Sequence, residues 1–241
     1  MEITFHPLGE AAVKCCFQED ISPALTDQIQ AFCRKLRSQK GTGLIEWVPA
    51  YDSVAVYYDP WDTSYEKITT LLQNIAVGMD TKSHQVKKVI TIPTFYGGDY
   101  GPDLENLANT NNLSPTDVIN LHTGASYLIN MIGFLPGFPY LSGLDEQIAM
   151  PRLESPRESV PAGSVGIAGS QTGIYPLDSP GGWNLIGRTP LRLFDPEEDE
   201  PFLFEQGDYL HFKSINEEEY QRIQREVEDG TYELEHREGF E

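Results

Sequence analysis

The residues best suited to bind a small ligand lie in three Gly/Pro-rich segments, 96–104, 133–141 and 151–190. Glycine lets a ligand approach the main chain, and proline fixes the turns around it. Aromatic side chains in the same segments can line a cleft in which backbone N–H groups face a small, planar, carboxylated molecule. The corners of a β-barrel need glycine and proline as well, so both interpretations stay open. The loop glycines that we expect at such a cleft are Gly137, Gly163, Gly181 and Gly182.

Four arginines fall in or beside the third segment of this otherwise acidic chain: Arg152, Arg157, Arg188 and Arg192. A guanidinium can grip a carboxylate or a phosphate through two parallel hydrogen bonds. Arg152 and Arg157 are the preferred ligand contacts, because both flank prolines just ahead of a glycine-rich loop, and Arg188 is a further candidate. Ordinary surface ion pairs are the alternative for each of them.

His122 is the histidine best placed for catalysis, because it ends a predicted helix just before Thr123-Gly124. An imidazole there can transfer protons near neutral pH, or can simply interact with the helix dipole. Three polar side chains can orient an amide or a lactam by hydrogen bonds, or can be turn residues, and one indole can form part of the wall. These substrate-binding candidates are Gln171, Tyr175 and Asn184, with Trp183.

Several common catalytic and metal-binding patterns are missing. The sequence has no GxxxxGK[ST], no GxSxG and no HExxH, so neither a P-loop ATPase nor a self-sufficient hydrolase is indicated. The three cysteines lack CxxC spacing and the five histidines are scattered, so we predict no metal site.

Charge and hydropathy limit the possible partners. The formal net charge is -20, which argues against nucleic acid, because phosphate binding needs clustered Lys and Arg. Residues 195–241 hold 17 acidic and 4 basic residues, which suits a solvated surface or a docking surface for a basic partner. No stretch approaches the roughly 20 apolar residues of a membrane helix, and residues 1–5 show no signal region. We therefore expect a cytoplasmic protein that does not enter a membrane.

The elements that must position these residues fall into an α+β arrangement. Residues 1–85 predict a small N-terminal α/β sandwich domain, with a strand, a helix, two strands and a second helix. Residues 86–214 predict a closed or nearly closed β-barrel with a short helical insert. Residues 215–241 predict an acidic C-terminal extension with a helix over 216–229 and a frayed last dozen residues. The short strands expected in the barrel are 127–133, 165–169, 173–175, 183–186, 191–194 and 209–212, and the polar stretch 78–84 is the expected linker.

Ten motifs in order give the chain a specific resemblance over about residues 3–213. They are 7–12, 46–51, 96–98, 101–104, 133–134, 136–141, 155–157, 160–165, 173–176 and 179–183. In these motifs the chain resembles the family of the B component of 5-oxoprolinase, which is also described as the kinase A inhibitor (KipI) family and as allophanate hydrolase subunit 1. Asn184 stands where the family pattern predicts Gln, and the acidic segment after about Ser214 is longer than the family's usual end.

The resemblance implies that the C-terminal barrel is cyclophilin-like and that the chain is one subunit of an ATP-dependent 5-oxoprolinase. Such a complex opens 5-oxoproline (pyroglutamate) to L-glutamate and also needs a C component (KipA-like) and an A component, so the isolated chain is expected to be inactive. ATP is then used by the complex, and the component that binds it stays open. Two alternatives remain: an inhibitor of a sensor histidine kinase, and a subunit of an allophanate or urea-derivative hydrolase or carboxyltransferase.

Overall fold

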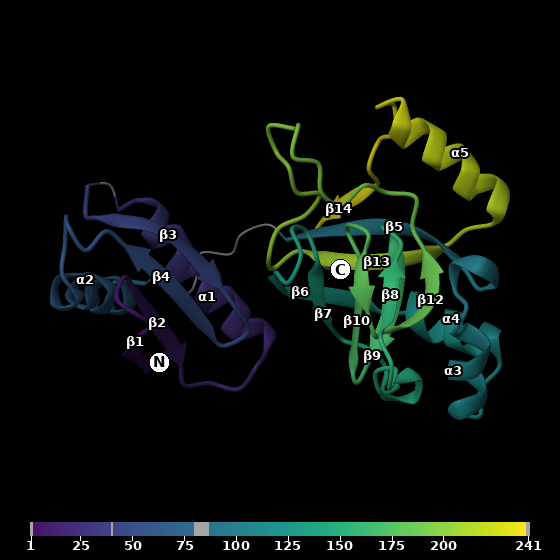
Figure 1. Ribbon diagram of the computed structural model, residues 1–241, viewed down its shortest axis with the longest axis horizontal. Helices are drawn as coiled ribbons and strands as arrows, with labels where there is room; N and C mark the ends of the chain where they lie inside the picture. Colours follow the sequence, from purple (N-terminus) through teal and green to yellow (C-terminus); the bar gives the residue numbers. More distant parts are fainter. Residues whose placement is uncertain (1, 40, 80–86, 240–241) are drawn as a thin grey trace. The chain divides into compact units, whose positions relative to one another are not determined.

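The computed structural model describes residues 2–39, 41–79 and 87–239, which belong to two compact units, Met1–Gln85 and Val86–Glu241 (Figure 1). Most of the expected linker at 78–84 lies outside the described residues. Each unit has its own apolar core, so each is described by itself.

The first unit is a two-layer sandwich of one antiparallel sheet and two helices, as the sequence predicts. Its strands run in the order β1-β2-β4-β3, and alternate strand residues such as Val13 and Cys15 pack on the helices. Ser22 caps the first helix, because its Oγ accepts a hydrogen bond from the Leu25 backbone N–H at 3.2 Å. Strand β1 was not expected from the sequence. The elements are β1 (Ile3–Pro7), β2 (Ala12–Phe17), α1 (Pro23–Arg37), β3 (Leu44–Pro49), β4 (Ser53–Tyr58) and α2 (Tyr65–Val77).

The second unit is built on a closed barrel of seven strands. Their order is β12-β9-β10-β7-β6-β13-β5, and pairing of β5 with β12 closes the ring. The β5–β13 pair is parallel and the other pairs are antiparallel, so the barrel is mixed. The strands are β5 (Lys88–Tyr96), β6 (Ser126–Ile132), β7 (Pro139–Ser142), β9 (Ser164–Ala168), β10 (Gln171–Ile174), β12 (Asn184–Arg188) and β13 (Tyr209–Ser214). The barrel prediction is therefore confirmed.

Short elements surround the barrel. The predicted helical insert forms two helices, and Ser114 caps the second one in a reciprocal pair with Asp117. A strand predicted at 191–194 is absent: among the described residues this stretch makes one isolated bridge, between Phe194 and Phe202. The surrounding elements are η1 (Gly98–Tyr100), α3 (Leu104–Thr110), α4 (Pro115–Thr123), η2 (Glu146–Ile148) and a two-stranded sheet of β8 (Arg157–Val160) and β11 (Ser179–Gly181).

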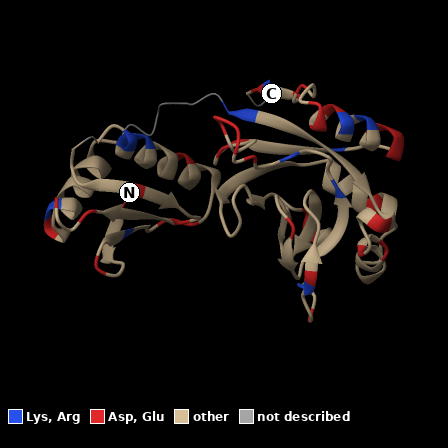
Figure 2. Ribbon diagram, turned by 45° about the horizontal axis from the view of Figure 1, so that its top comes forward, with Lys and Arg blue, Asp and Glu red and all other residues tan. Residues whose placement is uncertain are grey.

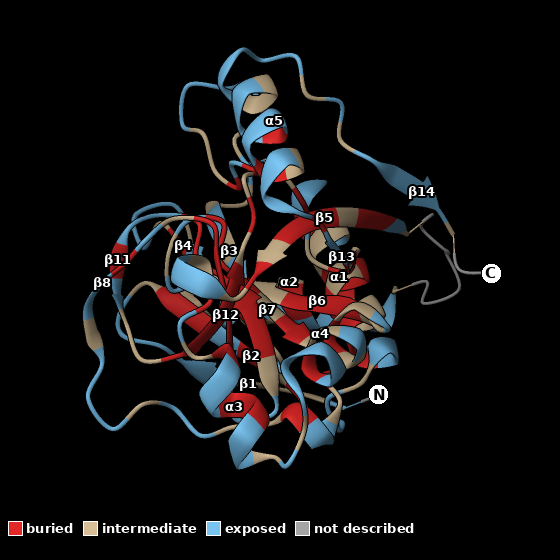
Figure 3. Ribbon diagram, turned by 90° about the vertical axis from the view of Figure 1, so that its right-hand side faces the viewer, coloured by how far each residue is buried: buried red, intermediate tan, exposed pale blue. Residues whose placement is uncertain are grey.

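The acidic C-terminal segment packs on the barrel unit. Helix α5 (Glu217–Glu228) buries Tyr220 and Ile223 in the barrel core and exposes most of its other side chains (Figure 3). The charged residues of that helix include both signs (Figure 2). The expectation of a frayed last dozen residues is wrong, because β14 (His236–Glu238) pairs with the first residues of β5. β12 pairs only with the last residues of β5, and β14 covers the edge that the first residues of β5 would otherwise leave unpaired.

None of the described helices combines the length and the apolar character that crossing a membrane requires.

Candidate functional site

A second apolar cluster lies on the outer face of barrel strands β9 and β10. Side chains on a strand alternate between its faces, and Val165 and Ile167 point into the barrel core, so Gly166 points outward. Gly166 and Gly173 are direct partners across the two strands. The outer cluster consists of Phe138, Val160, Ala168, Tyr175, Trp183 and Leu185.

The paired glycines leave room for the Trp183 side chain to pack closely on the sheet. A Cβ atom on Gly173 would stand 3.0 Å from Cζ3 of Trp183 and 3.2 Å from Cε1 of Phe138. A Cβ on Gly166 would stand 3.1 Å from Cβ of Trp183. Carbon atoms do not approach that closely without displacement, so these two positions suit glycine and fix the place of the indole.

Phe138 is the centre of the aromatic cluster. Its ring centre lies 5.0 Å from that of Tyr140, 5.3 Å from Tyr175 and 5.4 Å from Trp183, with the last two rings nearly perpendicular to it. Edge-to-face packing of this kind is favourable and directional. Phe138, Tyr175 and Trp183 are buried, whereas Tyr140 is half-buried and reaches the surface. The cluster therefore offers a rigid aromatic support with one hydroxyl at its rim.

Arg152 is the cation of this surface. The residue is exposed, and its guanidinium carbon lies 5.9 Å from the centre of the Trp183 ring. Burial raises the pKa values of the Tyr140 and Tyr175 hydroxyls, and the positive charge of Arg152 opposes both rises. In the part of the chain that the structure describes, no carboxylate lies within ion-pair distance of Arg152. Its charge is therefore available for an anionic ligand.

Hydrogen bonds on both sides of Arg152 fix the backbone that carries it. The Asn184 side-chain amide donates to the carbonyl of Pro151 at 2.8 Å and to that of Ile167 at 3.1 Å. The Leu153 N–H donates to the Gly182 carbonyl at 2.8 Å. Segment 150–153 is therefore tied to the barrel, and the backbone that carries the Arg152 side chain is fixed before any ligand arrives.

Asn184 was predicted to contact the ligand, but it lies fully buried behind the Arg152 segment. Its amide nitrogen faces two carbonyls, which fixes the orientation of the group. Its Oδ1 atom is buried and has no hydrogen-bond partner among the described residues. Asn184 therefore supports the site from below.

Arg157 is not available for a carboxylated ligand as the sequence suggested. Its Nη2 donates to both carboxylate oxygens of Asp103, at 2.7 and 2.9 Å, and its Nη1 donates to the Trp183 carbonyl at 3.3 Å. Asp103 also accepts from the Leu185 N–H at 2.6 Å. This ion pair joins β8 to β12 and to the start of α3. Asp103 lies in the motif at 101–104 but was not among the predicted site residues.

Arg188 and the remaining candidates have structural contacts. The Nε atom of Arg188 donates to the Ala162 carbonyl at 2.8 Å, and its guanidinium carbon lies 5.9 Å from the Tyr100 ring centre. Gln171 begins β10 opposite Ala168 and is half-buried. The Tyr175 hydroxyl is packed so closely on Gly181 that a Cβ there would lie 2.3 Å from it.

The other loop glycines serve turns. Gly137 and Gly163 have φ angles of 82° and 81°, a left-handed conformation that glycine adopts without strain. A Cβ on Gly163 would lie 2.3 Å from the Thr189 carbonyl oxygen. Gly182 supplies the carbonyl that holds Leu153. Two of these glycines support the surface around Arg152: Gly181 packs on Tyr175, and Gly182 bonds Leu153.

His122 lies inside the barrel and not at a ligand surface. It has no exposed surface, its Nδ1 bonds the Tyr96 hydroxyl at 2.8 Å, and its Nε2 bonds the Thr172 hydroxyl at 2.9 Å. Burial lowers the pKa of His122 to about 3. A neutral, enclosed imidazole cannot exchange protons with a bound ligand, and this placement argues against the predicted catalytic role.

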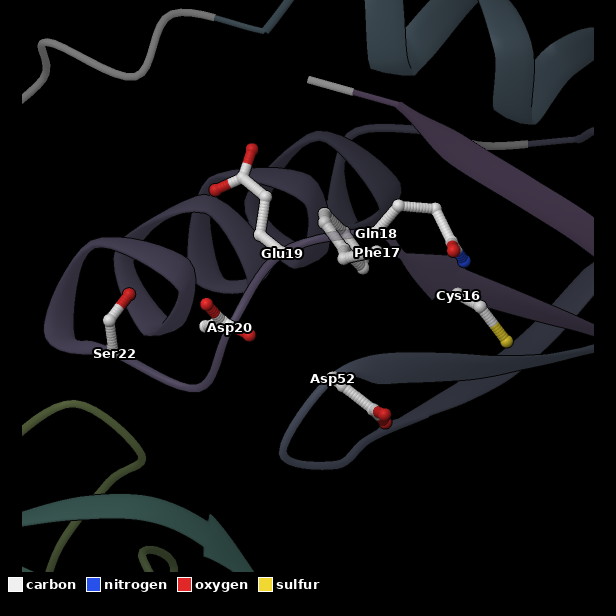
Figure 4. Close-up of a pocket in the computed structure, with 7 residues that line it drawn as sticks. All are labelled: Cys16, Phe17, Gln18, Glu19, Asp20, Ser22 and Asp52. Carbon is white, nitrogen blue, oxygen red and sulfur yellow. The ribbon is translucent and has the colours of Figure 1, made fainter.

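A separate hollow in the first unit does not suit a carboxylated ligand. It lies between the end of β2 and the start of α1 (Figure 4). Three carboxylates line it, from Glu19, Asp20 and Asp52, and it has no cation. Among the described residues, no group of three His, Cys, Asp or Glu side chains is arranged to hold a metal ion.

The family described as carboxyltransferase domain, subdomain C and D, matches residues 3–204 of the chain. The B component of 5-oxoprolinase from Bacillus subtilis is 42% identical over 91% of this chain and 95% of that protein. A urea amidolyase from Lachancea kluyveri is 30% identical over 96% of this chain and only 14% of that protein. The crystal structure of TTHA0988 superposes with a TM-score of 0.76 and 35% identity, and the match covers 85% of this chain and 40% of the solved chain.

Proposed function

The chain belongs to the carboxyltransferase subdomain C and D family and, within it, to the B components of 5-oxoprolinase, and we propose that Arg152 holds the carboxylate of 5-oxoproline on its barrel. The protein is thus one subunit of a 5-oxoprolinase. We further propose that the assembly is cytoplasmic, uses ATP and includes the A and C components.

The observation that supports this role is an exposed arginine without a carboxylate partner among the described residues, fixed over an aromatic surface. The substrate combines a carboxylate with a small five-membered lactam ring. Arg152 suits the carboxylate, and the face of Trp183 with the Tyr140 ring suits the CH₂ groups of the lactam.

The chemistry needs more than this surface supplies. A lactam carbonyl is a poor electrophile, and transfer of a phosphoryl group from ATP to its oxygen makes the carbon susceptible to water. Water adds to that carbon, and the ring C–N bond then breaks, which leaves the free amine and an acyl phosphate on the side-chain carboxyl. A second water hydrolyses this acyl phosphate to L-glutamate and phosphate. Arg152 holds the carboxylate that does not react, so it orients the ring for these steps.

Catalytic groups have to come from the other components of the enzyme. Asp103, which bonds the backbone of Leu185 in the outer cluster, is already engaged by Arg157 and by that N–H. His122 is enclosed in the barrel. We therefore propose that the A and C components provide the ATP site and the groups that activate water, and that the isolated chain is inactive.

The test is reconstitution of glutamate formation. The chain is mixed with the A and C components, ATP and 5-oxoproline, and glutamate is measured while each component in turn is left out. We expect glutamate only from the full mixture. A stable complex that forms no glutamate would overturn the proposed function and favour a urea-derived substrate or inhibition of a sensor histidine kinase, which can be assayed with the same preparation.

The role of Arg152 is tested in the same mixture. Arg152→Ala should raise KM for 5-oxoproline about tenfold or more with a smaller change in kcat, because the carboxylate is bound but does not react. Arg152→Lys keeps the charge and should recover part of the loss. Arg222→Ala is the control, because Arg222 lies on α5 and forms a surface ion pair with Glu226. An Arg152→Ala complex with unchanged kinetics would remove Arg152 from the site.

A further inference from the structure

Three large apolar side chains are exposed at one end of the barrel unit. Phe134 is 68% exposed, Phe202 is 46% exposed and Leu177 is 36% exposed. Isolated apolar residues on a surface are ordinary, whereas neighbouring ones mark an interaction surface.

The contacts of the 133–138 loop place them together. A Cβ on Gly137 would lie 3.1 Å from Cβ of Phe194 and 3.5 Å from Cβ of Pro176, so this loop touches both other segments. The rings of Phe194 and Phe202 lie 5.3 Å apart, and Leu177 directly follows Pro176. These contacts define an apolar end of the barrel unit, formed by Phe134, Leu177 and Phe202.

Phe134 is held on the surface at an energetic cost. Its φ angle is 69°, a left-handed conformation that is uncommon for side chains other than Gly, Asn and Asp. Asn or Gly would adopt this turn at lower cost and would not expose a phenyl ring to water. An unfavourable backbone that presents an exposed aromatic ring indicates that the ring is used.

A strongly acidic loop borders this surface. Residues 195–200 include Asp195, Glu197, Glu198, Asp199 and Glu200, and only Pro201 separates them from Phe202 (Figure 2). Arg192 pairs with Asp195, and no other ion pair involves this loop in the described part of the chain. The border of the apolar end therefore carries a net negative charge.

We propose that the apolar end docks another component of the 5-oxoprolinase, one that presents an apolar pocket for Phe134 bordered by Lys and Arg side chains. This inference rests on the proposed function for the identity of the assembly. A second copy of the chain does not suit the surface, because a symmetric contact would bring two acidic loops together. Phe134 also packs on Phe138, with ring centres 5.9 Å apart, so a partner docked here borders the aromatic cluster beside Arg152.

The position of this surface has a functional consequence. Phe138 packs on both Phe134 and Trp183, so a partner protein seated on Phe134 is connected to the proposed carboxylate site through the aromatic cluster. It can then supply catalytic groups to a ligand that Arg152 holds. Two incomplete surfaces would form one site only when the proteins are assembled.

The test measures association of the intact chain with the C component and with the A component, separately, by calorimetry without ATP or 5-oxoproline. Phe134→Asn should weaken binding to one of them about tenfold or more, which is typical of a central aromatic contact. Its Tm should be unchanged or higher, because Asn fits the left-handed turn. Trp61→Asn is the control: Trp61 is 96% exposed, lies in the first unit and should leave binding unchanged.

A second variant tests the acidic border. Replacing Glu197, Glu198, Asp199 and Glu200 with their amides should slow association and flatten its dependence on salt. Unchanged affinity in both variants would overturn the proposal, as would self-association of the wild-type chain that Phe134→Asn abolishes. Normal assembly without glutamate formation would count against the proposed function alone and would leave the docking surface supported.

Discussion

Replacing Asp103 is expected to destabilise the barrel, because its carboxylate holds Arg157 in place. If Arg157 served only to bind the ligand, loss of Asp103 would leave the stability of the barrel unchanged. Asp103→Ala removes two charge-assisted hydrogen bonds from Arg157 and one from the Leu185 N–H. Loss of the bond from Leu185 leaves its backbone N–H unpaired, which costs about 1–3 kcal/mol. The ion pair is partly buried, with side chains 29% and 13% exposed, and contributes about 1 kcal/mol more. We therefore expect a loss of about 3 kcal/mol.

The reciprocal variant should cost less. Arg157→Ala leaves Asp103 bonded to Leu185 and close to the surface, so we expect a loss of about 1–2 kcal/mol. The double variant should be less destabilised than the sum of the two single losses, because each single variant already removes the shared bonds. That difference isolates the energy of the pair.

Urea unfolding followed by the fluorescence of Trp183 is the suitable assay. The chain has three tryptophans, so the measurement is made in a background in which Trp47 and Trp61 are Phe. Trp183 then reports on the barrel alone, which matters because the two units have separate cores. Unchanged stability in Arg157→Ala, together with a large rise in KM for 5-oxoproline, would refute the structural role and restore Arg157 as a ligand contact.

Three further predictions concern the core and the support of the site. Asn184→Ala should lower barrel stability by about 2 kcal/mol, measured by urea unfolding, and should raise KM in the reconstituted complex by loosening the segment that carries Arg152. Gly173→Ala should destabilise by about 1–3 kcal/mol and shift the emission of Trp183, because the added methyl group meets the indole at 3.0 Å; an unchanged spectrum would contradict the packing described. The pKa of His122 is lowered to about 3 in the folded protein, so the unfolded chain binds its proton first and stability falls as pH decreases from 6.5 toward 3. In His122→Gln this part of the pH dependence, measured by thermal unfolding, should disappear.

Local patterns predicted the fold well, because N-cap residues mark the starts of its helices and short apolar runs mark its strands. The Ser22-Pro23 and Ser114-Pro115 starts of α1 and α4 and the short barrel strands follow from nearby residues. The errors arise where distant segments decide the outcome. β14 pairs with the distant strand β5, whereas residues 191–194 make only an isolated bridge among the described residues. Such pairings carry no local signal.

The same limit explains which site residues the sequence could identify. Arg152 and Trp183 were predicted, and the structure brings them together. Arg157 looked equally suitable, because its partner Asp103 is 54 residues away and the ion pair is invisible in sequence. His122 has the chemistry of a proton carrier, but burial by Tyr127 and Phe212 decides its pKa. The residue type indicated which chemistry a side chain can perform. Tertiary contacts determined whether that side chain can reach a ligand.

The place of β13 in the barrel also determines when the barrel can form during synthesis. This strand lies between β5 and β6, although 77 residues or more separate it from either along the chain. A ribosome must therefore release residues up to about 214 before the ring can close, while the core of the first unit is complete by Val77. We expect the first unit to fold early in translation. Strands β5 to β12 then keep unpaired edges until β13 is released, and during this interval the chain depends most on chaperones to prevent aggregation.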